Sequence, residues 1–193
     1  MLSNPEEKLD PRVKRTRNLI LQSVETLLAE KSFSAITVQD ITDMAEINRA
    51  TFYAHFEDKY ALLEFFIRQK FMQEIKKRVL NACHYTPENL HTLILAVCEF
   101  LSHLKTGCAQ PQHQFEPLVE KQIKAQIQEL LTVWLNKMDA PASAEIPVTV
   151  ATWSIYGLAS YWSNSKQNLT LDTFISEALP LVAVNLEQFA QAA

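Results

Sequence analysis

Apolar residues recur along this chain every three or four positions, which is the spacing of amphipathic helices. Long runs of this kind predict helices over about 58–80, 117–138, 146–162 and 170–190, and a further helix from Thr86-Pro87 to Gly107. Pro180 lies inside the last run and predicts a kink or a break there. No segment alternates apolar and polar residues over the length of a strand, so the pattern predicts an all-α fold.

The N-terminal third is predicted to hold shorter helices, each with a suitable capping residue at its start. Asp10 precedes a proline and begins a helix that ends near residues 31–32. Thr37 and Asp40 have the spacing of a capping box and begin a second, short helix. Asn48 caps a third helix that ends near residue 55. Two short helices joined by one tight turn predict a helix-turn-helix.

These elements divide the chain into two predicted domains. Residues 1–57 form an N-terminal, three-helix, helix-turn-helix domain that binds DNA, and the fourth helix, 58–80, links it to the rest. Residues 81–193 form a C-terminal helical bundle for effector binding and dimerisation. The length of 193 residues suits a small domain joined to a larger one.

Composition argues against an enzyme. Gly107 and Gly157 are the two glycines of the chain, too few for a phosphate-binding loop or a dinucleotide fingerprint. The sequence also lacks a nucleophile elbow and a paired-histidine metal helix. Cys83, Cys98 and Cys108 have no metal-ligand spacing, so we expect buried, reduced thiols. We therefore expect no catalysis, no cofactor and no metal.

No apolar run approaches the length of a membrane span, and the first 17 residues lack the apolar core of a signal peptide. These features predict a cytoplasmic protein that does not interact with membranes. The net charge of −4 does not by itself indicate nucleic-acid binding, and residues 1–60 also hold more acidic than basic side chains. A DNA surface on this protein would have to be a local basic patch.

The second helix of the helix-turn-helix supplies such a surface. If Phe52 and Phe56 are buried, Ala50 and Ala54 point away from the core, and Arg49 lies at the tip of the helix. Small outward residues let a helix approach base edges, and an arginine can bind guanine with two hydrogen bonds. The same pattern is also common in helical proteins that do not bind DNA, so on its own it leaves both interpretations open.

The segment from Phe33 to Leu63, FSAITVQDITDMAEINRATFYAHFEDKYALL, resembles the DNA-binding domain of the TetR/AcrR family of transcriptional regulators. The resemblance rests on fixed offsets at nine positions: Thr37, Thr51, Phe52, Tyr53, His55, Phe56, Lys59, Leu62 and Leu63. It covers about 50 residues; the remainder of the chain is similar to the family only in size and helical content.

The resemblance implies a set of DNA contacts. Arg49, Ala50 and Thr51 would touch base edges, and Gln39 would reach a base from the preceding helix. Phosphates would be held by Thr37, Tyr53, His55 and Lys59. Lys14, Arg15 and Arg17 would lie near the flanking backbone or minor groove, although a solvated helix face explains this cluster equally well.

Two positions depart from the family pattern. Glu46 stands where the family has a glycine in the turn between the two short helices, and Ser32 replaces a glycine before Phe33. A left-handed backbone would cost a glutamate about 1 kcal/mol, so we expect a turn of different shape. A carboxylate there would also repel DNA.

The resemblance further implies a homodimer on a palindromic, double-stranded operator, most commonly as a repressor that responds to a small-molecule effector. Candidate residues for the dimer interface are Ala151, Trp153, Gly157, Ser160, Tyr161, Phe174, Ala178 and Leu181. Candidate residues for the effector pocket are Phe100, His103, Leu104, Phe115, Leu131, Trp134 and Met138. Ordinary core packing is an alternative for both sets. A helical ligand- or protein-binding module of the same fold with impaired DNA binding is the alternative function.

Overall fold

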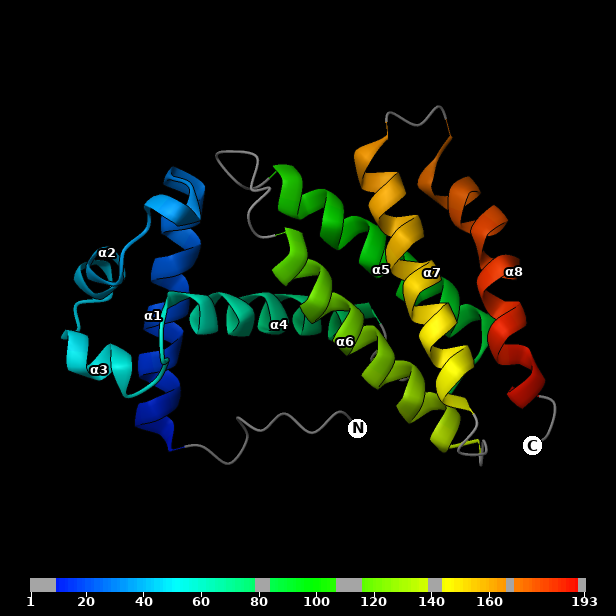
Figure 1. Ribbon diagram of the computed structural model, residues 1–193, viewed down its shortest axis with the longest axis horizontal. Coiled ribbons are helices and arrows are strands. Elements are labelled where there is room, and N and C mark those ends of the chain that lie inside the picture. The colour runs from blue at the N-terminus through cyan, green and yellow to red at the C-terminus, as the bar shows by residue number, and fades with distance from the viewer. Residues whose placement is uncertain (1–9, 79–83, 107–115, 139–143, 166–168, 191–193) are drawn as a thin grey trace. The chain divides into compact units, whose positions relative to one another are not determined.

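The described part of the chain consists mainly of α-helices (Figure 1). The computed structural model describes residues 10–78, 84–106, 116–138, 144–165 and 169–190. Within these residues it contains α1 (Pro11–Glu30), the 3₁₀ helix η2 (Phe33–Ala35), α2 (Val38–Met44), α3 (Arg49–Tyr53), α4 (Lys59–Arg78), α5 (Pro87–Thr106), α6 (Glu116–Asn136), α7 (Glu145–Asn164) and α8 (Leu171–Ala190). The predicted all-α fold is confirmed.

The chain divides into two compact units. The first contains α1 to α3 and the start of α4 as far as Ile67, together with a stretch that ends at Val119. The second contains Arg68–Leu104 and the chain from Glu120 onward. The helix α4 therefore contributes residues to both units. The domain limits expected from the sequence stay a prediction.

The first unit has a core to which α1, α2 and α3 all contribute. Ile20 and Val24 of α1, Ile41 of α2 and Phe52 of α3 are fully buried, and α2 packs against both α1 and α3. The helices begin where their caps predict: the Asp10 carboxylate accepts a hydrogen bond from the Arg12 amide at 2.7 Å. The apolar stripes read from the sequence thus face one shared interior.

The turn between α2 and α3 keeps the left-handed conformation despite its glutamate. Glu46 has φ 53°, so the expectation of a differently shaped turn is wrong. The amide of Ile47 donates to the carbonyl of Thr42 at 3.0 Å, and the amide of Glu46 donates to the carbonyl of Asp43 at 3.3 Å. These two bonds form a Schellman motif, which ends α2 and satisfies carbonyl groups that lack helical partners. The bonds compensate for the steric cost at Glu46.

The second unit buries larger side chains. Trp134 of α6 is fully buried, and the ring centroids of Phe71 and Phe100 lie 5.1 Å apart. Cys98 is a buried free thiol, as expected, and burial raises its pKa to about 12; Cys83 and Cys108 lie outside the described residues. The helix α8 continues through Pro180, so it does not break there, and the alternative expectation of a kink at this residue stays a prediction.

Replacing Glu46 with glycine is expected to stabilise the first unit by about 1 kcal/mol, because glycine adopts a left-handed backbone without a steric cost. Glu46→Ala is the matched control: it removes the carboxylate but keeps the Cβ and hence the strain. Denaturant unfolding of the three proteins measures the difference. Equal stability of the glycine and alanine variants would show that the turn holds no such strain.

Candidate nucleic-acid interface

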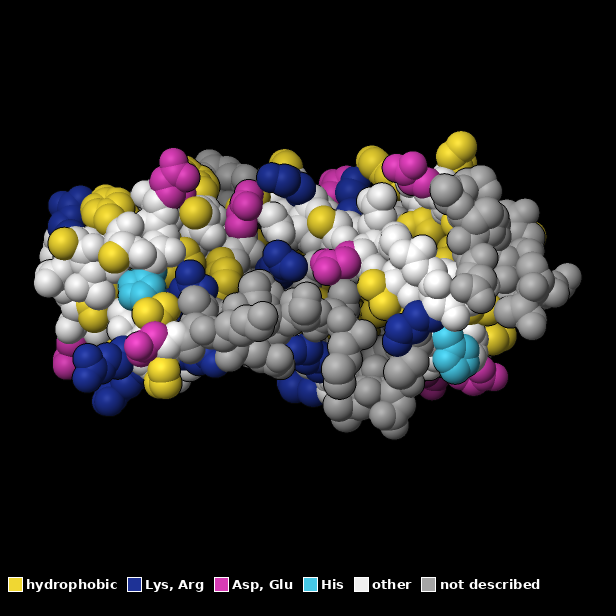
Figure 2. Space-filling view, turned by 90° about the horizontal axis from the view of Figure 1, so that it is seen from below, with side chains coloured by type: hydrophobic (Ala, Val, Ile, Leu, Met, Phe, Trp, Pro, Cys, Tyr) yellow, Lys and Arg dark blue, Asp and Glu magenta, His cyan; other side chains and the backbone are white. Residues whose placement is uncertain are grey.

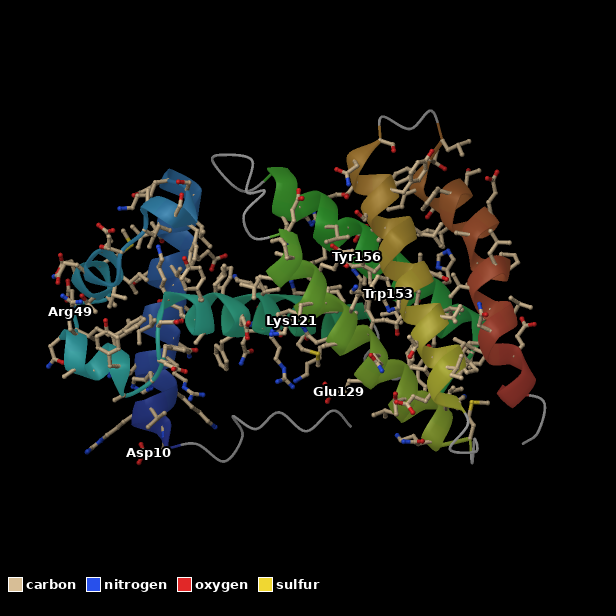
Figure 3. The ribbon with its side chains drawn as sticks, viewed as in Figure 1. Asp10, Arg49, Lys121, Glu129, Trp153 and Tyr156 are labelled. Atoms are coloured by element: carbon tan, nitrogen blue, oxygen red, sulfur yellow. The ribbon has the colours of Figure 1, made fainter. Side chains whose placement is uncertain are left out.

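The helix α3 has one buried side and one exposed side. Phe52 is fully buried and its ring centroid lies 6.0 Å from that of Phe56. Arg49, Ala50 and Ala54 are exposed. Tyr53 is 49% exposed although its ring packs edge-on against Phe52 at 5.4 Å. Figure 3 shows Arg49 at the outer margin of its unit, at the start of α3. The outward surface therefore presents one guanidinium, two methyl groups and one phenol.

The cap of α3 limits what Thr51 can offer to a ligand. The Asn48 side-chain oxygen accepts hydrogen bonds from the Thr51 amide at 2.7 Å and from the Thr51 hydroxyl at 2.9 Å. A hydroxyl has one hydrogen to donate, and here it is directed at the cap. Thr51 can therefore meet a base edge through its methyl group or as an acceptor.

The start of α2 is a closed capping box. The Thr37 amide and hydroxyl both donate to one Asp40 carboxylate oxygen at 2.7 Å, and the Asp40 amide donates to the Thr37 hydroxyl at 3.1 Å. Lys31, at the end of α1, adds an ion pair with Asp40 at 3.0 Å. These bonds, first those from Thr37 and then that from Lys31, lower the pKa of Asp40 to about 2. Both donors of Thr37 are directed into the protein.

Gln39 is exposed on α2, and its amide group has a fixed orientation. Its side-chain nitrogen donates to the Asp43 carboxylate at 2.6 Å. A carboxylate accepts but does not donate, so the amide NH₂ must face Asp43. The carbonyl oxygen of Gln39 is then turned away from Asp43. Sequence reasoning missed this role of Asp43, although the i, i+4 spacing of the pair is a usable signal.

Lys59, the first residue of α4, is bonded inside the unit. Its ammonium nitrogen lies 2.6 Å from the Ile36 carbonyl oxygen, 3.1 Å from that of Phe33 and 3.3 Å from that of Ser34. Burial lowers the pKa of this ammonium, and the charge of Asp40 partly offsets the effect. These carbonyl partners could not be found from the sequence, because they lie more than twenty residues away from Lys59 along the chain.

His55 follows α3 and is half-buried. Burial lowers its pKa below the ordinary value, and the positive charge of Arg17 lowers it further. A neutral imidazole can still donate one ring N–H to a phosphate. The Arg17 guanidinium lies 5.3 Å from the ring centroid of Phe65 and 5.9 Å from that of Phe56. Arg17 thus packs on aromatic rings near His55 as well as carrying charge.

The other basic residues of the candidate interface lie on the first half of α1. Arg15 is exposed and Lys14 is half-buried. Figure 2 shows Lys and Arg side chains, in dark blue, along the margin of the α1–α3 region, with acidic side chains among them. The basic surface is therefore local, as a net acidic chain requires.

The predicted dimer residues are split between the inside and the outside of the second unit. Ala151, Phe174 and Ala178 are buried and Ser160 is half-buried, whereas Trp153, Gly157, Tyr161 and Leu181 are exposed. Three further exposed apolar side chains, Ile146, Val150 and Val184, were not singled out from the sequence. Their spacing of three to four residues from the exposed members on α7 and α8 is a signal that could have found them.

The predicted effector residues occupy α5, α6 and the turn after α6. Phe100, Leu131 and Trp134 are buried, Leu104 and Met138 are half-buried, and His103 is exposed; Phe115 lies outside the described residues. In the part of the chain that is described, no three His, Cys, Asp or Glu side chains form a cluster able to hold a metal ion. Nor does any described helix combine the length and apolar character needed to span a bilayer.

Residues 20–64 match the family model described as "Bacterial regulatory proteins, tetR family". Through this segment, which is less than a quarter of the chain, the protein matches the TetR family. The matched segment contains α2, α3 and the start of α4, so the match rests on the helix-turn-helix described above. Sequence reasoning identified the same family.

Another relative is an uncharacterized HTH-type transcriptional regulator of Bacillus subtilis (strain 168), YxbF. It is 42% identical to the protein described here over 65 residues, which are 33% of this chain and 17% of that protein. The match therefore spans less than a fifth of the relative's length.

Several solved structures share the TetR-family fold. A TetR transcriptional regulator from Streptococcus agalactiae 2603V has a TM-score of 0.55 at 20% identity, covering 93% of this chain and 99% of its own. The dihydroxyacetone kinase operon activator DhaS has a TM-score of 0.57 at 18% identity, with coverages of 90% and 97%. FadR from Bacillus subtilis, in complex with stearoyl-CoA, has a TM-score of 0.52 at 16% identity, with coverages of 88% and 98%.

The capping box makes the stability of the first unit sensitive to acid. Because the pKa of Asp40 is lowered from 3.8 to about 2, its contribution is complete above about pH 4 and is lost as the pH falls toward 2. Asp40→Asn is expected to be less stable at neutral pH and to show a flatter loss of stability between pH 5 and pH 2. Thermal unfolding across this range measures the effect.

Glu30→Gln, which changes an exposed carboxyl at the end of α1, serves as the control and is expected to keep the acid dependence of the original protein. Parallel pH profiles for the original protein and Asp40→Asn would contradict the assignment.

Proposed function

We propose that this chain is a transcriptional regulator of the TetR family that binds double-stranded DNA through α3. The observation that carries the proposal is the exposed side of α3, which combines one guanidinium, two alanine methyl groups and one phenol on a helix held by two buried phenylalanines. Small side chains allow the helix axis to approach the floor of a major groove. The fold alone would not support this assignment, because one fold serves many functions.

Base recognition would come from the first turn of α3. Arg49 is placed to bind a guanine with two hydrogen bonds, and Ala50 and the Thr51 methyl group suit a thymine methyl. Gln39, with its NH₂ facing Asp43, would present its carbonyl oxygen to an amino group on a base edge. Each contact uses atoms that remain available after the internal hydrogen bonds are formed.

Phosphate contacts would position this surface. Tyr53 and neutral His55 each offer one donor, and Lys14, Arg15 and Arg17 would supply charge on the flanking backbone. Thr37 directs both of its donors at Asp40, so we propose that it fixes the start of α2 instead of binding a phosphate. The interface is small and its charge is local, so binding should weaken steeply with salt.

We propose that the regulator works as a homodimer on a palindromic operator. Ile146, Val150, Trp153, Gly157 and Tyr161 recur every three to four residues on the outside of α7. A Cβ at Gly157 would meet nothing within 4 Å, so a second helix can approach closely at this position. Leu181, 69% exposed, and Val184, 65% exposed, continue the apolar surface on α8, which packs against α7. Contiguous apolar surface of this kind is typical of an interface.

The second unit is proposed to bind an apolar small-molecule effector among the side chains of α5 and α6, including Phe100, Leu131 and Trp134. The FadR structure that shares this fold is a complex with stearoyl-CoA, which supports a ligand with an apolar part for this chain. Effector binding would shift the population of α4 positions and thereby release DNA, which is the behaviour of a repressor.

A second candidate function is favoured by Glu46. Its carboxylate lies exposed in the turn of the helix-turn-helix and would repel phosphates. If this repulsion dominates, the protein is a ligand- or protein-binding module of the same fold with impaired DNA binding. Absence of salt-sensitive binding to any duplex would favour this alternative.

DNA binding is tested by selecting duplexes from a random pool and measuring their affinity over a range of salt concentrations. Arg49→Ala is expected to relax the preference at one base pair by roughly 10- to 100-fold, because a bidentate contact discriminates by about 1–3 kcal/mol. Arg15→Ala should instead weaken all duplexes and reduce the slope of log K against log[salt] by about 0.9.

Lys76→Ala, which removes an exposed charge from the second unit, is the control and should leave both quantities unchanged. A uniform effect of Arg49→Ala on all sequences would contradict its role in base recognition.

The dimer is tested by sedimentation equilibrium. Leu181→Glu is expected to weaken the dimer by at least about tenfold, because it buries an unpaired charge in an apolar interface. Ser176→Glu places the same side chain on the same helix, outside the apolar surface, and should leave the dimer intact. If the two variants behave alike, α8 does not form the interface.

A further inference from the structure

Three backbone carbonyl groups converge on one ammonium group in the first unit. The nitrogen of Lys59 lies 2.6, 3.1 and 3.3 Å from the carbonyl oxygens of Ile36, Phe33 and Ser34. An ammonium has three N–H bonds, so its hydrogen-bonding capacity matches this set. We propose that Lys59 is a positioning residue, which ties the start of α4 to the connection between α1 and α2 and does not bind a DNA phosphate.

The connection needs such a donor. η2 is a three-residue 3₁₀ helix, too short to pair its own last carbonyl groups. The side chains of Phe33 and Ile36 are fully buried, which holds the backbone of the connection against the core. The ammonium also lies 4.8 Å from the Phe33 ring centroid, and Tyr60 packs edge-on against the same ring at 5.5 Å. Lys59 is thus held by both charge and ring contacts.

These bonds compete with a phosphate contact. To reach a phosphate, the ammonium would have to release three carbonyl groups of a segment that is anchored by buried side chains. The carbonyl of Phe33 would keep the Ile36 amide as a donor, but those of Ser34 and Ile36 would lose the ammonium. Lys59 is half-buried, and this burial lowers the pKa of its ammonium. Other cations of the unit, such as exposed Arg15, can approach DNA without breaking internal bonds of this kind.

Lys59 and its carbonyl partner Ile36 lie next to the starts of two different helices. Ile36 directly precedes Thr37, the cap of α2, and Lys59 directly follows Asp58, whose carboxylate accepts hydrogen bonds from the first amides of α4 at 2.7 and 2.8 Å. The ammonium therefore joins the starts of two helices. Because α2 packs against α3, the hydrogen bonds of Lys59 also help to fix the position of α3.

The test compares Lys59→Met with the original protein in two measurements. The first is hydrogen exchange of the Ala35 and Ile36 amides, which donate within η2. We expect exchange at least about tenfold faster in the variant, because the carbonyl side of the connection loses its partner. The second is DNA affinity as a function of salt, an arm that rests on the proposed function. We expect weaker binding with an unchanged slope, since no phosphate contact is lost.

Lys14→Met is the matched control for exchange: it makes the same chemical change near the opposite end of α1 and should leave the Ala35 and Ile36 amides unaffected. If Lys59→Met does not fold, Lys59→Arg carries the test. Lys59→Arg keeps the positive charge, so a phosphate contact would survive the change. A planar guanidinium, however, fits three converging carbonyl groups poorly. Faster exchange and weaker binding with an unchanged slope are again expected.

Unchanged hydrogen exchange in the Lys59 variants overturns the proposal. A slope of log K against log[salt] that falls by about 0.9 in Lys59→Met also overturns it, because this is the value for one lost phosphate contact. If the original protein binds no duplex at all, the proposed function fails, while the exchange comparison still decides whether Lys59 is an anchor.

Discussion

A helix of five residues has almost no stability of its own, and the candidate interface depends on one. Isolated helices shorter than about 12–15 residues are marginal in water, and α3 spans only Arg49–Tyr53. It persists because Phe52 is fully buried and because Asn48 caps its first turn. The same burial decides which side of the helix is left outside. Exposure of Arg49, Ala50 and Tyr53 is thus a consequence of how Phe52 packs.

Local chemistry explains what the sequence predicted well. The capping box of Thr37 and Asp40 and the cap at Asn48 involve residues three apart, so their spacing alone indicated where α2 and α3 begin. The buried side of α3 followed from the four-residue spacing of Phe52 and Phe56. These features need no knowledge of the remaining fold, and the family pattern in the same segment added which of the exposed residues would contact DNA.

Features that depend on a balance of energies or on distant partners were not predictable in this way. The strain at Glu46 is outweighed by two backbone hydrogen bonds, a balance that the residue type does not reveal. The carbonyl partners of Lys59 are brought near by the fold. At Pro180 the packing of α8 outweighs the loss of one hydrogen bond, so the helix continues. At Lys59 and Pro180 the deciding contacts come from tertiary structure, whereas at Glu46 they are local backbone hydrogen bonds.

The connection from Lys31 to Thr37 is fastened at both ends. Lys31 pairs with Asp40, Phe33 and Ile36 are buried, and the ammonium of Lys59 binds the carbonyl groups between them. Surface loops usually accept inserted residues with little penalty. The Lys31–Thr37 connection would not accept an insertion. A single added residue would move the buried side chains of Phe33 and Ile36 out of register with the carbonyl groups that Lys59 binds. Among relatives, variation in length should therefore collect in other connections and spare this one.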